Sequence, residues 1–181
     1  MACRNRQIAA YIKFATKDIT MNLQILSPSI NVYACPQDFL TERFLLGLAS
    51  SLSHRPDAPP IGFYVGSDKA TYEYFLADPE LGFNKSGVYF LIQNYDELVS
   101  RLMTNPNTYF FVLNSKSFLS EFPSSPEPLL NQLRTQYQVT FFMQWHAMTY
   151  PNKSKPLMFS VLSHNYEWID SLADAVWFVE S

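Results

Sequence analysis

Residues 108–113 read TYFFVL, and this short run of β-branched and aromatic side chains decides the class of fold that the sequence predicts. No polar residue alternates with the apolar ones inside the run, which is typical of a strand that is buried on both faces. Five more runs of this kind follow the same rule: Ile30–Cys35, Ile61–Val65, Gly87–Gln93, Val139–Gln144 and Leu157–Leu162. We therefore predict a set of strands in the interior of a sheet.

Segments with helical spacing separate these runs. The apolar residues of 39–52 recur every three or four positions, and the segments Tyr95–Met103 and Pro128–Tyr137 behave in the same way. Strands that alternate with helices predict an α/β fold, with a mainly parallel sheet flanked by helices on both faces. Residues 1–27 leave two alternatives open, an antiparallel pair of edge strands or a helix followed by a strand.

Length and composition limit the class of protein. A chain of 181 residues, 48% hydrophobic and 16% charged, is large enough for one domain with a packed core and too apolar for a disordered protein. No apolar run reaches the roughly 20 residues that a membrane-spanning helix needs. The two cysteines, Cys3 and Cys35, form neither a disulfide framework nor a metal-binding spacing. We expect an intracellular protein without membrane contact.

Glycine is scarce, with five in the whole chain against a usual share of about 7%. No phosphate-binding glycine motif can be written from them. The segment after the first predicted strand, residues 35–42, also contains no lysine, while Pro36 lacks an N–H and Asp38 would repel phosphate. The sequence therefore excludes ordinary dinucleotide enzymes and ordinary ATPases.

Charge is distributed unevenly. Residues 1–20 carry four bases against one acid, a balance of +3, whereas residues 165–181 carry four acids and no base. The basic arm is either a solvated terminus or a contact to nucleic-acid phosphates. The four candidate contacts in it are Arg4, Arg6, Lys13 and Lys17.

Side chains at the ends of the predicted strands are the candidates for chemistry, because ligands of open parallel sheets bind there. Asp68, Lys116 and His146 each follow such a strand. A lone Lys–Asp pair or a single histidine at a strand end is more often structural than catalytic. His54 and His164 have no ligand partners at metal-binding spacing. We assign no catalytic residue and no metal ligand.

The order of the segments resembles the RecA-like ATPase superfamily over residues 28–181. INVYACPQDFLTERFLLGLASSL is similar to the first core strand, phosphate loop and helix of that family, and IGFYVGSDKA resembles its next strand. NTYFFVLNSKSFLSEF resembles the strand that ends in Asp-Ser, and SHNYEWIDSLADAVWFVES resembles the closing element. The resemblance implies a RecA-like core at 28–181, preceded by an N-terminal basic arm or edge strands at 1–27.

Departures from that family fall on the nucleotide site. Under the resemblance, Thr41 stands at the loop lysine, Glu42 at the metal-holding hydroxyl, and Asn114 at the magnesium-binding aspartate. Asp68 stands near the catalytic acid. The resemblance thus implies a degenerate nucleotide site at Cys35, Leu40, Thr41, Glu42, Asp68 and Asn114, with no cofactor and no enzymatic activity.

The function implied by this resemblance is that of a divergent recombinase paralogue. Such a chain would pair with a second RecA-like protein in a hetero-oligomer and assist recombinase filaments in homologous recombination and DNA repair in the nucleus. Lys153 and Lys155 lie where the family carries a DNA-contacting loop, so the complex would meet single-stranded DNA there, unless the loop is a solvated turn. Two alternatives are a scaffold subunit of a RecA-like ring such as Elongator, which serves tRNA modification, and a small flavodoxin-like binding protein or enzyme.

Aromatic residues are abundant, with 15 Phe, 11 Tyr and 3 Trp. We predict that those of the strands form the core. Because one modest core rarely absorbs so many, we also expect some to form an exposed patch for a protein partner.

Overall fold

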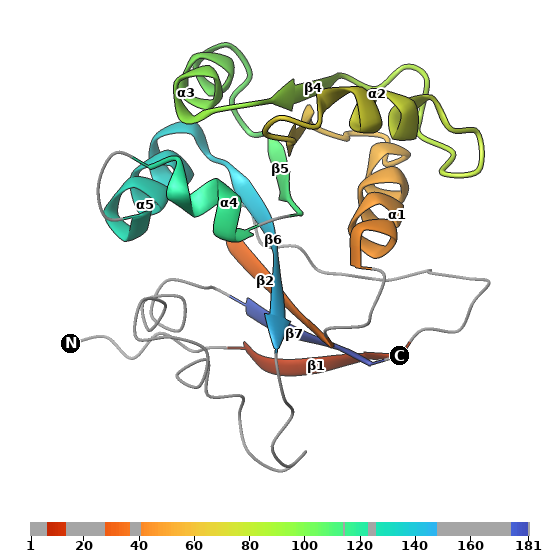
Figure 1. Cartoon of the computed structure of the whole chain (residues 1–181), viewed down its shortest axis with the longest axis horizontal. Helices are drawn as coiled ribbons and strands as arrows, with labels where there is room; N and C mark the ends of the chain where they lie inside the picture. The colour runs from red at the N-terminus through yellow and green to blue at the C-terminus, as the bar shows by residue number, and fades with distance from the viewer. Residues whose placement is uncertain are drawn as a thin grey trace.

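The computed structural model describes residues 7–13, 28–36, 41–113, 115–122, 126–147 and 175–180 (Figure 1). The strands are β1 (Gln7–Lys13), β2 (Ile30–Pro36), β3 (Ile61–Tyr64), β4 (Tyr89–Ile92), β5 (Tyr109–Val112), β6 (Thr140–Ala147) and β7 (Ala175–Glu180). The helices are α1 (Thr41–Ser53), α2 (Lys69–Ala77), α3 (Tyr95–Thr104), α4 (Ser115–Ser120) and α5 (Pro126–Tyr137).

The strands form one seven-stranded sheet in the order β1-β7-β2-β6-β5-β3-β4, and every neighbouring pair is parallel. The predicted α/β class with a parallel sheet and flanking helices is thereby confirmed. Five of the predicted strands coincide with β2 to β6 to within a few residues. The predicted strand Leu157–Leu162 lies outside the described residues.

The sheet has a hydrophobic core on each face, and successive residues of a strand contribute to different cores because their side chains point to opposite faces. Phe110 packs into a core closed by α3, α4 and α5, whereas Phe111 packs into a second core closed mainly by α1 and α2. Both rings are fully buried. Figure 1 shows the corresponding division, with α1 and α2 on one side of the strands and α4 and α5 on the other. This two-sided burial explains why the predicted strands are continuously apolar.

The helices that were predicted carry clear start signals. At α3 the side chain of Asn94 accepts a hydrogen bond from the N–H of Glu97 at 3.0 Å, which satisfies a free donor of the first turn. Helix α5 starts at Pro126, two residues before the predicted start, since proline is tolerated in a first helical turn. The predicted helix of residues 39–52 is observed as α1.

Two helices were not predicted. Helix α2 has a short apolar face, in which Tyr72 is buried and Phe75 and Leu76 are partly buried, and the exposed Tyr74 interrupts the contrast between this face and the polar one. Helix α4 has six residues, which is under two turns. Both helices are short, and their apolar residues pack against the sheet.

The N-terminal segment contributes β1, which is one of the two edge strands among those described and pairs in parallel with β7. The edge position agrees with one of the two alternatives for residues 1–27. The parallel pairing with β7 was not anticipated, because the antiparallel alternative paired this segment with residues 19–26. Residues 14–27 lie outside the described part of the chain.

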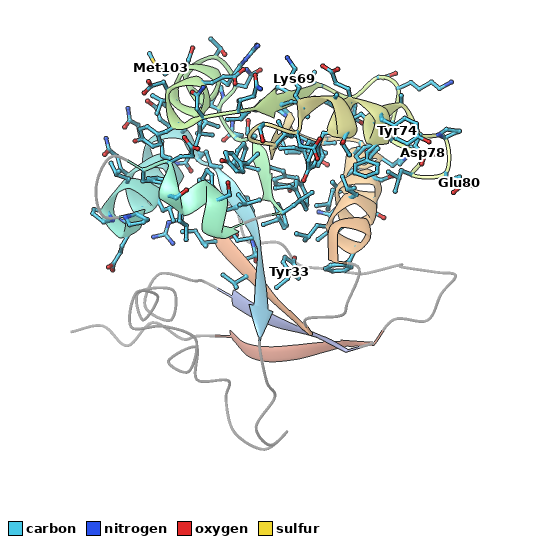
Figure 2. All side chains as sticks on the ribbon, in the orientation of Figure 1. Tyr33, Lys69, Tyr74, Asp78, Glu80 and Met103 are labelled. Carbon is cyan, nitrogen blue, oxygen red and sulfur yellow. The ribbon has the colours of Figure 1, made fainter. Side chains whose placement is uncertain are left out.

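Among the strand aromatics whose side chains are described, Phe63, Phe110, Phe111, Phe141 and Phe142 are all fully buried, as predicted for core residues. The expected aromatic patch is not found among the described side chains. Their exposed large apolar residues are Tyr74, Val88 and Met103, of which one is aromatic, and Figure 2 shows Tyr74 and Met103 well apart. No helix in the described ranges is long and apolar enough to span a membrane.

Candidate functional site

The carboxyl ends of β3 and β5 lie side by side, and we take this edge as the candidate site. After β3 the polypeptide turns to α2 on one face of the sheet, and after β5 it turns to α4 on the other face. The two segments thus diverge between β3 and β5, as they do at the ligand-binding crevice of open α/β sheets. A tight turn leaves β3, in which the N–H of Asp68 donates to the carbonyl of Val65 at 3.0 Å.

Tyr64 and Gly66 occupy the space between the carboxyl ends of β3 and β5. Gly66 adopts a φ of +53°, which is strained for any residue with a Cβ, and a Cβ built there would lie 3.3 Å from the hydroxyl of Tyr64. The Tyr64 hydroxyl lies 3.3 Å from Oγ of Ser117, and its ring packs on Phe118 with centroids 5.1 Å apart. Tyr64 is 4% exposed. Side chains therefore fill the position where a ligand would enter between the two strands.

The electrostatic surroundings of Tyr64 favour its neutral form. Burial raises the pKa of the Tyr64 hydroxyl above its ordinary value of 10.0, and the negative charge of Glu121 adds to the rise. The hydrogen bond with Ser117 acts in the opposite direction. The hydroxyl of Tyr64 is therefore protonated at neutral pH.

Asp68 occupies the N-cap position of α2, and its exposed side chain makes no capping hydrogen bond. The neighbouring Lys69 forms a long ion pair of 4.0 Å with Glu73 one turn further along the helix. Both partners are about half exposed, so the pair contributes little to stability. Among the described residues, no hydrogen bond or ion pair joins the side chain of Asp68 to a partner for chemistry.

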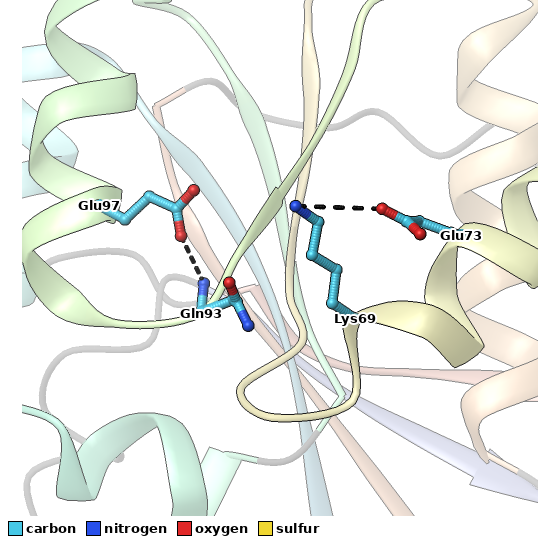
Figure 3. Close-up of polar contacts among 4 residues, drawn as sticks. All are labelled: Lys69, Glu73, Gln93 and Glu97. Atoms are coloured by element: carbon cyan, nitrogen blue, oxygen red, sulfur yellow. Dashed lines mark hydrogen bonds and ion pairs between the residues drawn. The ribbon is translucent and has the colours of Figure 1, made fainter.

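The end of β4 is closed by a second set of polar contacts. The N–H of Gln93 donates to the carboxylate of Glu97 at 2.9 Å, while the N–H of Glu97 donates to Asn94. Figure 3 shows this contact on one side of β4 and the Lys69–Glu73 pair on the other. The carboxylate of Glu97 is thus engaged in starting α3.

The residues of the proposed degenerate nucleotide site are placed as follows. Cys35 is in β2, opposite His146 of β6, and Thr41 and Glu42 are the first two residues of α1. Asp68 lies at the end of β3, three strands away from β2 in the sheet order. Leu40 and Asn114 lie outside the described residues.

One of the candidate DNA contacts lies in the described chain. Lys13 is the last residue of β1 and stands opposite Glu180 of β7 in the strand register. Arg4, Arg6, Lys17, Lys153 and Lys155 lie outside the described residues.

The three residues of the enzyme alternative come from three consecutive strands of the sheet. His146 is in β6, Lys116 begins α4 after β5, and Asp68 follows β3. His146 lies three positions beyond Met143, which is level with Val112 and Tyr64 across the sheet, so its backbone stands roughly 10 Å further along the strand direction. The fold brings the three residues to the carboxyl edge of the sheet.

Tyr64, Gly66 and Ser117 were missed by sequence reasoning. A signal for Tyr64 existed, because a tyrosine inside a strand buried on both faces must find a partner for its hydroxyl. Its partner Ser117 could not be named, since it depends on β5 lying next to β3. Within the described ranges, no group of three or more His, Cys, Asp or Glu residues could hold a metal ion.

Comparison with known proteins yields no family. No protein-family model matches the sequence, and no curated protein matches it either. The function must therefore be argued from the residues and the fold.

Proposed function

We propose that this chain is a non-catalytic RecA-like subunit that pairs with a second RecA-like protein and assists recombinase filaments on single-stranded DNA. The observation that carries the non-catalytic part is the packing of Tyr64 against Ser117 and Phe118 at the carboxyl edge of β3 and β5. A ligand-binding crevice at a strand end has to be open, and here buried rings and hydroxyls occupy it.

The sequence supports the same proposal at the carboxyl end of β2, three strands away from β3 in the sheet. The segment that follows β2 has neither the glycine nor the lysine that would hold a nucleotide phosphate. Without such groups the α/β fold can still bind a protein partner through its surface. The link to recombination rests on the resemblance of residues 28–181.

The proposal is tested by affinity purification of the full chain from cells, with mass spectrometry of the proteins that accompany it. A RecA-like protein should co-purify in stoichiometric amount. Recovery of a large hetero-oligomer of a tRNA-modifying ring would favour the scaffold alternative instead. Recovery of the chain alone would contradict both forms of assembly.

DNA contact is tested on the purified complex by fluorescence anisotropy with labelled single-stranded DNA. Replacing Lys153 and Lys155 by alanine should weaken binding at low salt and reduce the slope of log K against log salt by roughly 1.4, about 0.7 for each lost phosphate contact. The matched control, Lys69→Ala with Arg101→Ala, removes the same charge elsewhere and should leave the slope unchanged. Equal effects of the two double variants, or no DNA binding at low salt, would overturn this part.

The enzyme alternative is favoured by one observation, the position of Asp68, Lys116 and His146 on neighbouring strand ends. It predicts that a small-molecule ligand protects the chain against thermal unfolding, and that His146→Ala abolishes that protection. The main proposal predicts no such ligand and, for the isolated chain, no binding of a fluorescent ATP analogue with magnesium.

A further inference from the structure

We propose that the outer edge of β4 joins a second copy of this chain, with the two β4 strands antiparallel about a two-fold axis at Phe90. This surface is independent of the proposed function, because it requires neither a RecA-like partner nor DNA. In the described part of the chain, β4 pairs with β3 alone. Figure 1 shows β4 at the upper limit of the sheet, between α2 and α3.

The hydrogen-bond pattern fixes which groups of β4 face outward. The carbonyls of Val88 and Ile92 accept from β3, from the N–H groups of Ile61 and Val65 at 2.9 and 2.8 Å. In a parallel ladder every second residue of a strand bonds to a given neighbour. The even-numbered residues of β4 therefore face β3, and the N–H and C=O groups of Tyr89 and Leu91 point to the outer edge.

Both ends of this outer edge are already closed. At one end the N–H of Gln93 donates to the carboxylate of Glu97 at 2.9 Å, and at the other the N–H of Gly87 donates to the carbonyl of Asn84 at 3.0 Å. Tyr89 and Leu91 are left between them. Each contributes one backbone N–H and one backbone C=O. Because the two residues are two positions apart, these groups match the same groups of a second, antiparallel β4.

A second copy satisfies all of these groups at once. With the axis at Phe90, Tyr89 of one copy lies opposite Leu91 of the other, and an opposed pair of this kind exchanges both of its backbone hydrogen bonds. The symmetry repeats the pair, so all the donors and acceptors that Tyr89 and Leu91 direct outward are used. Such an isologous contact closes on itself and does not propagate into fibres.

Side chains along the edge agree with this register. Val88 is 56% exposed, and the axis at Phe90 sets it level with Ile92 of the other copy, whose own side chain is fully buried beneath α3. Lys85 is brought to the end of the other copy's strand, where α3 begins with Asp96 and Glu97, so that opposite charges meet. Residues 86–93 contain no charge and no proline, two of the devices that keep an exposed edge from pairing, although β4 itself is short.

The segment that leads into β4 is held rigidly and presents the edge without a further ordering cost. The N–H and the side-chain amide of Asn84 donate to Oγ and to the carbonyl of Ser53, at 3.1 and 3.0 Å. The hydroxyl of Tyr89 donates in turn to the carbonyl of Asn84 at 2.7 Å. Strand β4 is thereby tied to the end of α1, and pre-organisation of this kind favours association.

The test is sedimentation equilibrium on the full chain over a range of concentrations. The wild type should show a monomer–dimer equilibrium. Val88→Lys should raise the dimer dissociation constant by about tenfold or more, because a lysine on an edge strand opposes pairing with another strand. Gln132→Lys adds the same charge to the exposed face of α5 and should leave the constant unchanged.

Two further experiments complete the test, a charge swap between Lys85 and Asp96 and hydrogen exchange of the backbone amides. Lys85→Glu and Asp96→Lys should each weaken the dimer, and the double variant should recover most of the loss. The amides of Tyr89 and Leu91 should be protected from hydrogen exchange at dimer concentrations and exposed when the chain is diluted. A chain that stays monomeric, protection that persists in the monomer, or a dimer insensitive to Val88→Lys would each overturn the proposal.

Discussion

Gly62, in the middle of β3, lies beneath two aromatic rings that reach across from the neighbouring strands. It is level with Phe90 of β4 and Phe110 of β5 in the strand register. A Cβ at Gly62 would come within 2.5 Å of the Phe90 ring and 2.7 Å of the Phe110 ring. Glycine is required here by close approach rather than by backbone conformation, because the space above it is already occupied.

Gly62→Ala should therefore lower the free energy of unfolding by roughly 1–3 kcal/mol, the usual cost of overpacking a core. Gly47→Ala is the matched control, because Gly47 lies within α1 and a Cβ there meets nothing within 4 Å. That variant should gain up to about 1 kcal/mol from the better helix propensity of alanine. Denaturant unfolding of both variants measures the contrast, and two effects of the same sign would contradict it.

Tyr64 gives a prediction about pH. Because burial raises the pKa of its hydroxyl in the folded chain, the unfolded chain releases this proton first as the pH rises above about 10. The contribution of the Tyr64 hydroxyl to the free energy of unfolding is fully present below that pH, and it is lost as the pH rises through the higher pKa of the folded chain. Stability should fall over this alkaline window less steeply in Tyr64→Phe than in the wild type. The control is Tyr74→Phe, which removes an exposed hydroxyl and should keep the wild-type slope.

Single residues were predictable from sequence where one local property decides their place. The burial of Phe110 and Phe111 follows from a run without polar residues, and the first-turn acids of α3 follow from the helix dipole. The role of Ser117 could not be predicted in this way. It depends on a contact with Tyr64 across 53 positions of sequence.

Among the secondary-structure elements, α2 and α3 differ in how they start. The N-cap Asn94 of α3 accepts a hydrogen bond from the N–H of Glu97, whereas the N-cap Asp68 of α2 makes no side-chain capping bond. Asn94→Ala should therefore cost about 0.5–2 kcal/mol of stability. Asp68→Ala should cost no more than a few tenths of a kcal/mol, through the lost interaction of its charge with the helix dipole. Thermal unfolding of the two variants in parallel measures the difference, and equal losses would count against the assigned caps.

Elements with a strong period were predictable and those without one were not. Helix α3 buries Leu98 and Leu102 one turn apart, which is a visible stripe. Helix α2 has a shorter face of this kind, the buried Tyr72 with the partly buried Phe75 and Leu76, and this helix was not predicted. Three apolar residues over nine positions, with the exposed Tyr74 among them, give a weaker period than that of α3.

At the scale of the whole molecule, the parallel class was predictable and the strand order was not. Periodicity tells which side chains are buried, but it does not tell which strand lies beside which. The central strand β2 pairs with β6 and β7, and the buried side chain of Asn31 donates to the carbonyl of Phe141, 110 residues away in sequence. The candidate site depends on this order, because β3 and β5 become neighbours only when β4 passes to the outside.

The position of β2 has a consequence for synthesis on the ribosome. Strands β3, β4 and β5 pair among themselves, so this part of the sheet can assemble as soon as residues 61–113 have emerged. Strand β2 emerges before all of them, yet its two neighbours are made last. During translation its apolar residues remain without a strand partner while most of the chain is produced. The growing polypeptide therefore exposes the apolar strand β2, which can aggregate, until β6 and β7 have been made. Binding by a chaperone in this interval would increase the yield of folded protein.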